Sequence, residues 1–150
     1  MKNDFGKFFE DFKINQKIKH YPGKTITESD NNLFCLLTMN HHPVHLDQHY
    51  AKKSKHKKIL VNGLLIISTV VGMTVRDISG KAIANLEYNK VVHHNPTFLN
   101  DTLYAETTVI SKKLSKNKKN GVVHVKTKSF NQNKKIILSF ERKVLVPRKI

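Results

Sequence analysis

The side chains best able to do acid–base chemistry are concentrated in residues 40–47, whose sequence is NHHPVHLD. Imidazole can take and give protons near neutral pH because its ordinary pKa lies there. Pro43 fixes its own φ and drives His42 toward an extended conformation, so a helix ahead of this segment must end before His42. We therefore expect His45 to be presented from a turn, where it is either a general base or acid or an ordinary surface or core-edge residue.

A metal site is the first alternative for these histidines. His41, His45 and His49 are spaced four apart, and on one continuous helix they would form a face of three imidazoles. Pro43 interrupts that helix, and the segment has neither a cysteine ligand nor an HExxH pattern. We therefore predict no bound metal, and expect His41 and His49, each taken alone, to be ordinary surface or core-edge residues.

Residues 38–47 (TMNHHPVHLD) resemble the hydratase motif of the MaoC-like enoyl-CoA hydratase/dehydratase family, whose common form is Asp-x-Asn-Pro-x-His. Pro43 and His45 match this form. Asn40 stands at the position of the family's catalytic aspartate, and His42 at that of its asparagine. This variant is similar to a branch of the family that acts on branched dicarboxylyl-CoA thioesters such as mesaconyl-CoA or itaconyl-CoA.

The resemblance implies reversible hydration of an enoyl-CoA, or dehydration of a 3-hydroxyacyl-CoA, by a hydro-lyase with no cofactor beyond the coenzyme A of its substrate. Asn40 carries no titratable proton, so we expect it to orient water or substrate. The second proton carrier is then His42, Asp47, or His45 acting in both transfers. The sequence leaves these three alternatives open.

Three further segments resemble the same family. Residues 9–12 (FEDF) resemble its N-terminal Phe-x-Asp-Phe signature, and residues 100–103 (NDTL) resemble its Gly-Asp-Thr-Leu turn, with Asn100 tolerating the left-handed conformation. Gly63, after Asn62, stands where the family opens its central helix with a glycine amide that points at the thioester oxygen. An unpaired N–H at a helix N-terminus suits a developing enolate. The resemblance implies Gly63 as catalytic donor, with Asn62 beside it as a substrate-binding residue. If the substrate carries a second carboxylate, His41 or Arg76 would bind it; otherwise Arg76 is an ordinary surface residue.

Three helices are expected to position these residues. Thr27 followed by Asp30 has the form of a helix N-cap, and we expect Leu33, Phe34, Leu36 and Leu37 to form the buried face behind it. A second short helix is expected over residues 46–53. Residues 63–79 are rich in β-branched side chains, but they are too long for an ordinary strand and are followed by Gly80, which favours a helix with Leu64, Ile67, Val71 and Thr74 on one stripe.

The rest of the pattern predicts strands. We expect a short edge strand within residues 13–20, a turn at Pro22 and Gly23, and further strands over residues 82–92, 103–111, 122–129 and 136–146. A helix that is apolar nearly all round needs structure around it. The sequence and the resemblance together predict an α+β hot-dog fold, a curved antiparallel sheet wrapped around a central helix, with residues 1–150 as one domain. A homodimer, or a higher assembly such as a dimer of dimers, is implied by the family.

The charge balance bears on partners and location. The chain has 27 Lys and Arg residues against 11 Asp and Glu, a formal net charge of +16, and such a field attracts any polyanion. Residues 52–58 and 112–119 hold lysine runs that look like solvated loops without aromatic side chains, so we expect only non-specific binding of nucleic acid, and one run could help to hold the phosphates of coenzyme A. With one cysteine, no apolar leader and no membrane-spanning stretch, a cytoplasmic protein is expected.

Two other functions remain open at this point. A hot-dog acyl-CoA thioesterase usually needs an acidic side chain on the central helix, and residues 63–75 contain none. A noncatalytic module that binds acyl-CoA or RNA is the other alternative, because Asn40 replaces the usual acid and the surface is basic.

Overall fold

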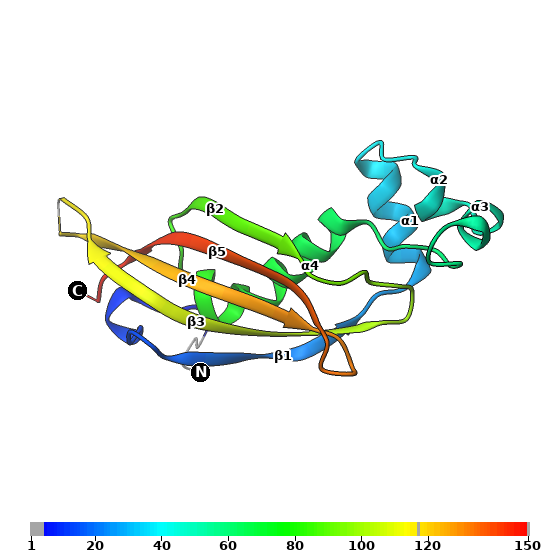
Figure 1. Cartoon of the computed structure of the whole chain (residues 1–150). Helices are drawn as coiled ribbons and strands as arrows, with labels where there is room; N and C mark the ends of the chain where they lie inside the picture. Colours follow the sequence, from blue (N-terminus) through cyan, green and yellow to red (C-terminus); the bar gives the residue numbers. More distant parts are fainter. Residues whose placement is uncertain (1–4, 117, 150) are drawn as a thin grey trace.

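The computed structural model describes residues 5–116 and 118–149, and its centre is a single antiparallel sheet (Figure 1). The strands lie in the order β1-β3-β4-β5-β2. Every strand expected from the sequence is present, with ends shifted by a few residues. The five strands are β1 (Lys17–Thr25), β2 (Ala84–His93), β3 (Thr102–Leu114), β4 (Asn120–Phe130) and β5 (Ile136–Pro147).

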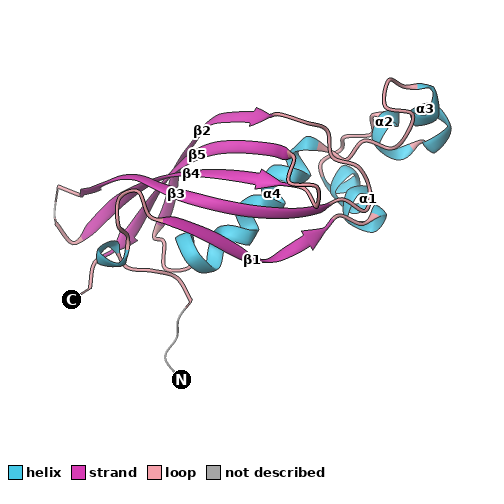
Figure 2. Ribbon diagram, turned by 60° about the horizontal axis from the view of Figure 1, so that its bottom comes forward, coloured by secondary structure: helices cyan, strands magenta, loops and turns pink. Residues whose placement is uncertain are grey.

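The predicted central helix is also present. It consists of α4 (Gly63–Thr74) and a π-helical continuation, η2 (Val75–Ser79), and it packs against one face of the curved sheet (Figures 1 and 2). The α+β hot-dog fold is therefore confirmed. Of the stripe named from the sequence, Thr74 is buried and Ile67 and Val71 are partly buried against the core, but Leu64 is 60% exposed. The inner face also carries Leu65, Ile66 and Val70. The sheet covers only one side of this apolar helix, so composition alone could not fix which side is buried.

The core on the concave side of the sheet has two parts. Ile66 and Val70 of α4 pack with Leu103 and Phe140 beside the first half of the helix. The second part lies around Ile78, and it includes Phe9, the first residue of the short 3-10 helix η1 (Phe9–Asp11), and Phe12, the residue after this helix. Phe9 and Phe12 are thus core residues, whereas Phe5 is 49% exposed.

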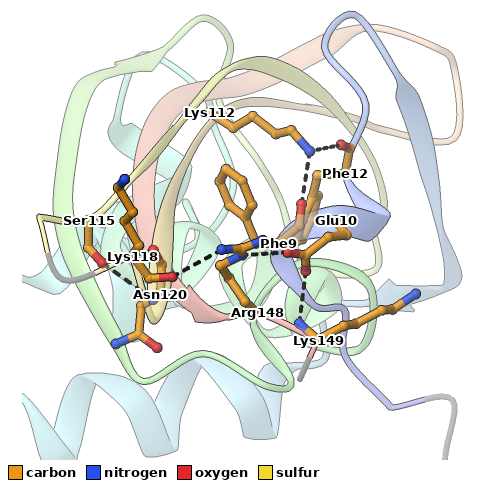
Figure 3. Close-up of polar contacts among 9 residues, drawn as sticks. All are labelled: Phe9, Glu10, Phe12, Lys112, Ser115, Lys118, Asn120, Arg148 and Lys149. Carbon is orange, nitrogen blue, oxygen red and sulfur yellow. Dashed lines mark hydrogen bonds and ion pairs between the residues drawn. The ribbon is translucent and has the colours of Figure 1, made fainter.

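Polar contacts fix η1 to the far end of the sheet (Figure 3). Lys112 Nζ donates to the carbonyl oxygens of Phe9 and Phe12, at 3.0 and 2.7 Å. Glu10 accepts from Arg148 Nε at 2.7 Å, and this guanidinium is the main cause that lowers the pKa of Glu10 to about 2. The expectation that residues 112–119 form a solvated loop is wrong at Lys112, which lies on β3 and is partly buried.

Three short helices form a lobe beyond the end of the sheet (Figures 1 and 2): α1 (Glu28–Leu37), α2 (Pro43–Leu46) and α3 (Gln48–Lys53). The predicted N-cap of α1 is confirmed, since Thr27 Oγ1 accepts the Asp30 N–H and the Asp30 carboxylate accepts the Thr27 N–H. Its predicted buried face is wrong except at Phe34, which is partly buried against the core. Leu33, Leu36 and Leu37 are exposed, and the buried residues are Asn31 and Cys35. In this lobe α1 packs only along the side that meets α2 and the start of α4, so hydrophobicity did not reveal its inner face.

The predicted turn at Pro22 and Gly23 is also wrong. Both residues lie within β1, where a cis Tyr21–Pro22 bond and a shift of register against β3 between His20 and Lys24 form a bulge. Because β1 is an edge strand, it can accept a proline without losing a central ladder. The Asn100 prediction is confirmed, with φ of 71°. Within the described part of the chain, no helix is both long and apolar enough to cross a bilayer.

Candidate active site

A cavity of about 270 Å³ opens at the N-terminal end of α4. It is lined by segments distant in sequence: α2, the start of α4, and the end of β2 with the loop that follows. Four of its side chains are imidazoles, which is unusual for so small a space. The imidazoles belong to His45, His56, His93 and His94, and Gly63 and Thr97 also line the cavity.

His45 lies on α2, which is a helix of one turn with Pro43 at its first position and His42 as its N-cap. The structure therefore presents His45 from a short helix, where the sequence predicted a turn, because proline is well accommodated at a helix start. His45 Nδ1 lies 2.7 Å from the carbonyl oxygen of Leu60. A carbonyl can only accept, so Nδ1–H is the donor and Nε2 keeps its lone pair. That tautomer is the one required of a general base.

Asn31, which the sequence pattern did not single out, holds the backbone of His45 in place. Its buried side chain donates from Nδ2 to the carbonyl oxygen of His45 at 2.9 Å, and its Oδ1 accepts the Asn62 N–H at 2.9 Å. One amide thus joins α1, α2 and the cap of α4. The available signal was an asparagine four residues before Cys35, on the same face of the helix.

Asn62 and Gly63 form the start of α4. Asn62 Oδ1 accepts the Leu64 N–H at 3.0 Å, and Asn62 Nδ2 lies 3.6 Å from Cys35 Sγ. Its side chain is buried in these capping contacts, so the structure gives it a place behind the cavity instead of the predicted contact with substrate. The Gly63 N–H has no acceptor among residues 5–116 and 118–149. It faces the cavity as a free donor at a helix N-terminus.

The other predicted residues of the motif lie beside the cavity and do not line it. Asn40 is half-buried and its Oδ1 accepts the His42 N–H at 3.3 Å. His42 Nδ1 accepts the Val44 N–H at 3.1 Å, and its exposed ring lies 6.1 Å from that of His45 between centroids. Asp47 Oδ1 accepts the Tyr50 N–H at 2.9 Å as the cap of α3. His42 and Asp47 are thus both used as helix caps.

Two predicted substrate-binding residues lie away from the cavity. His41 is exposed in the loop after α1. Arg76 is exposed on η2, thirteen residues after Gly63, which is about 20 Å along the helix. For the ranges described, no three His, Cys, Asp or Glu side chains are grouped so that they could hold a metal ion.

The end of β2 and the loop after it supply further residues of the cavity, which the sequence did not predict. His94 Nε2 lies 2.8 Å from Ser139 Oγ. Desolvation of the ring lowers the pKa of His93 below its ordinary value, and the neighbouring His94 lowers it further. Thr97 is 3% exposed, and its Oγ1 has no hydrogen-bond partner within the described residues. Nothing in the local sequence pattern marks these residues, because only the fold brings them to α4.

Comparison with known proteins gives consistent results. The MaoC-like domain family matches residues 10–131. A mesaconyl-CoA hydratase from Cereibacter sphaeroides is 35% identical over 149 residues, which is 99% of this chain and 43% of that protein. A putative MaoC domain dehydratase from Chloroflexus aurantiacus superposes with a TM-score of 0.95 at 33% identity, over 100% of this chain and 43% of that one.

A conserved hypothetical protein from Mycobacterium tuberculosis, described as having a double hot-dog fold, matches with a TM-score of 0.86 at 20% identity, over 96% of this chain and 45% of that one. At that identity the likeness concerns the fold alone. This chain thus spans about two fifths of the length of the curated relatives it matches, 43% in the case of the Cereibacter protein.

Proposed function

The chain belongs to the MaoC-like dehydratase family, and on that premise we propose that it is a hydro-lyase that adds water reversibly to an enoyl-CoA thioester. The observation that carries the proposal is the pairing, in one cavity, of the His45 imidazole with the free N–H of Gly63. The first is a base whose Nε2 lone pair is available. The second is a fixed donor for the charge that appears on a thioester oxygen.

In the proposed reaction His45 serves both proton transfers. Its Nε2 takes a proton from water while the water oxygen bonds to the β-carbon of the enoyl group. The π electrons of the double bond move through the α-carbon to the thioester oxygen, which accepts the Gly63 N–H as an enolate. The enolate then collapses, and the α-carbon takes the proton from His45. We favour one carrier because Asn40 cannot titrate and because His42 and Asp47 cap helices outside the cavity.

Within the class of enoyl-CoA thioesters, we propose that the substrate is a branched dicarboxylyl-CoA such as mesaconyl-CoA or itaconyl-CoA. Its support is the motif of residues 38–47 with Asn40 in place of aspartate, together with the 35% identity to a mesaconyl-CoA hydratase. A cavity of about 270 Å³ suits a short acyl group and leaves the coenzyme A outside.

The coenzyme A phosphates have an adjacent place to bind. A groove beside the cavity is lined by Lys52, Lys57 and Lys58, and Lys58 Nζ lies 3.8 Å from the centre of the Phe98 ring. Three ammonium groups there match an anionic nucleotide. We propose this groove for the phosphates, and assign any binding of nucleic acid to the general charge of +16.

We propose that residues 1–150 act as one domain and that two such domains pair through the edge strand β2. This strand is at the edge of the sheet and carries exposed apolar side chains, among them Leu86, Tyr88, Val91 and Val92. An exposed apolar edge normally needs a cover. The cavity adjoins the end of β2, so its mouth would lie near the pairing surface.

The test is a hydration assay with mesaconyl-CoA, itaconyl-CoA and crotonyl-CoA. Loss of the absorbance of the conjugated thioester, without release of free coenzyme A, is the expected result. Release of the thiol would assign the protein to the thioesterases instead, although α4 carries no acidic residue. Binding without turnover of any of the three would assign it to the noncatalytic modules.

A further inference from the structure

The His93 ring lies over the first residue of α4. His93 is the last residue of β2, in register with Leu138 of β5, and its neighbour His94 contacts Ser139. A Cβ atom built on Gly63 would lie 3.1 Å from His93 Cε1 and 3.2 Å from Nε2. Any other residue here would press against the imidazole, so the Nε2 edge of His93 lies close beside the helix N-terminus.

Three polar groups of this cavity have no hydrogen-bond partner in residues 5–116 and 118–149: the Gly63 N–H, the ring nitrogens of His93 and Thr97 Oγ1. His93 is exposed and Gly63 is half-buried, so both can reach a ligand or solvent, whereas Thr97 is 3% exposed. Buried polar groups are nearly always paired, so the unpaired Thr97 hydroxyl asks for an explanation. A polar ligand bound at this end of the cavity would provide one.

We infer that His93 is a catalytic residue of this cavity, whose Nε2–H donates a hydrogen bond to the thioester oxygen beside the Gly63 N–H. The inference rests on the proposed hydratase function and adds a donor to it. His93 exchanges no proton in this role. Its N–H and that of Gly63 together hold the negative charge that the oxygen gains as water adds to the β-carbon.

The chemistry of the ring favours a carbonyl oxygen over a carboxylate as its partner. Partial desolvation lowers the pKa of His93, so the ring is neutral at neutral pH. A neutral imidazole is a weak partner for an anion, but it is an effective donor to an oxygen on which charge develops, and a helix N-terminus favours the neutral form.

The test compares His93→Phe, which keeps a ring over Gly63 but has no N–H, with His93→Gln, which keeps an N–H. We expect His93→Phe to lower kcat about 100-fold to 1000-fold, the effect of losing one oxyanion donor, and His93→Gln to retain more activity. His49→Phe, on the exposed face of α3, is the matched control and should leave kcat unchanged.

A second readout does not depend on turnover. Crotonyl-CoA labelled with carbon-13 at its carbonyl is bound to the His45→Gln variant, and its C=O stretch is recorded by infrared spectroscopy. With His93 present the band should move to lower wavenumber than with the added His93→Phe change, because the donor polarises the carbonyl.

The outcomes separate the two proposals. A wild-type protein that neither binds nor hydrates any enoyl-CoA removes the proposed function and this inference with it. A wild-type protein that hydrates crotonyl-CoA, with His93→Phe equal to it in kcat and carbonyl frequency, overturns the inference alone. A lower kcat with an unchanged carbonyl frequency also overturns it, because His93 would then only shape the cavity.

Discussion

Single residues of the motif differ in what they can contribute, and His45 has the largest expected effect. Replacing His45 by Gln removes the imidazole lone pair, so kcat should fall about 100-fold to 10,000-fold, the usual contribution of general acid–base catalysis. His49→Gln, which alters an exposed histidine four residues away, should be silent. Steady-state kinetics with circular dichroism tests both, and a folded His45→Gln enzyme at the wild-type rate would remove His45 from the reaction.

Asn40 should behave differently, because it can position groups but cannot carry a proton. Asn40→Ala should therefore cost less activity than His45→Gln. Asn40→Asp would install the pair of residues common in the family and should keep or raise activity on a linear substrate. The measurement is kcat/KM of each variant on crotonyl-CoA and on mesaconyl-CoA. A larger loss for Asn40→Ala than for His45→Gln would reverse the assigned roles.

At this scale the sequence predicts the reacting groups better than the groups that support them. His45 and Gly63 are recognisable from the segments that resemble the family, and both residues line one cavity. Asn31, His93 and Thr97 are not recognisable in this way, because contacts between segments distant in sequence set their positions. Asn31 contacts Asn62, and His93 lies beside Gly63, and in each pair the two residues are about 30 positions apart or more.

Among the elements, the start of α4 depends most on a single side chain, that of Asn31. Asn31→Ala would leave the His45 carbonyl and the Asn62 N–H without their partner. Each unpaired buried group costs about 1–3 kcal/mol, so the free energy of unfolding should fall by roughly 2 kcal/mol or more, and kcat should fall as α2 loosens. Urea unfolding and kinetics measure both effects. Asn32→Ala, at the next position, is the control and should change neither.

The first turn of α1 predicts a dependence on pH. Hydrogen bonds from Lys24 and then from the Thr27 N–H lower the pKa of Asp30 from 3.8 to about 2. A carboxyl with a lowered folded-state pKa stabilises the protein above its unfolded pKa and loses this effect as the pH falls to the folded value. Asp30→Asn should thus be less stable than wild type at pH 7.

The difference between wild type and Asp30→Asn should shrink as the pH falls from about 4 toward about 2, the interval between the unfolded and folded pKa values. Urea unfolding at several pH values gives the comparison. Glu28→Gln removes the same charge from the same turn and serves as control. A difference that stays constant down to the folded pKa would show that the Asp30 carboxylate has no special role.

The elements themselves are largely predictable, but their orientation is less so. Length and the Gly80 stop suffice to predict the helix over residues 63–79, and alternation suffices for β4. The buried face of α1 is not predictable from hydrophobicity, because the lobe exposes Leu33, Leu36 and Leu37 and buries an asparagine. A hydrophobic pattern predicts the buried face only where a neighbouring element covers the apolar residues. Here α2 and the start of α4 cover the side of α1 that carries the asparagine instead.

For the whole molecule, the pairing of β2 edges is the proposal with the clearest test. Leu86→Lys puts a charge on the exposed apolar strand and should shift the protein toward the monomer in sedimentation equilibrium. Ile14→Lys, at a similarly exposed residue away from β2, should leave the distribution unchanged. Pairing through another surface is indicated if both variants assemble as wild type does.

The buried thiol of Cys35 makes the opening of this lobe measurable. It is the one cysteine in the sequence, it is 0% exposed, and it lies where α1 meets the Asn62 cap of α4. A thiol reagent can therefore react only when that junction opens. In the limit of fast reclosing, the labelling rate is the rate for a free thiol multiplied by the opening constant, so each tenfold slowing reports about 1.4 kcal/mol of opening free energy. Labelling in the presence of an acyl-CoA would then measure how much the bound ligand raises the free energy of opening at the start of α4, which carries Gly63.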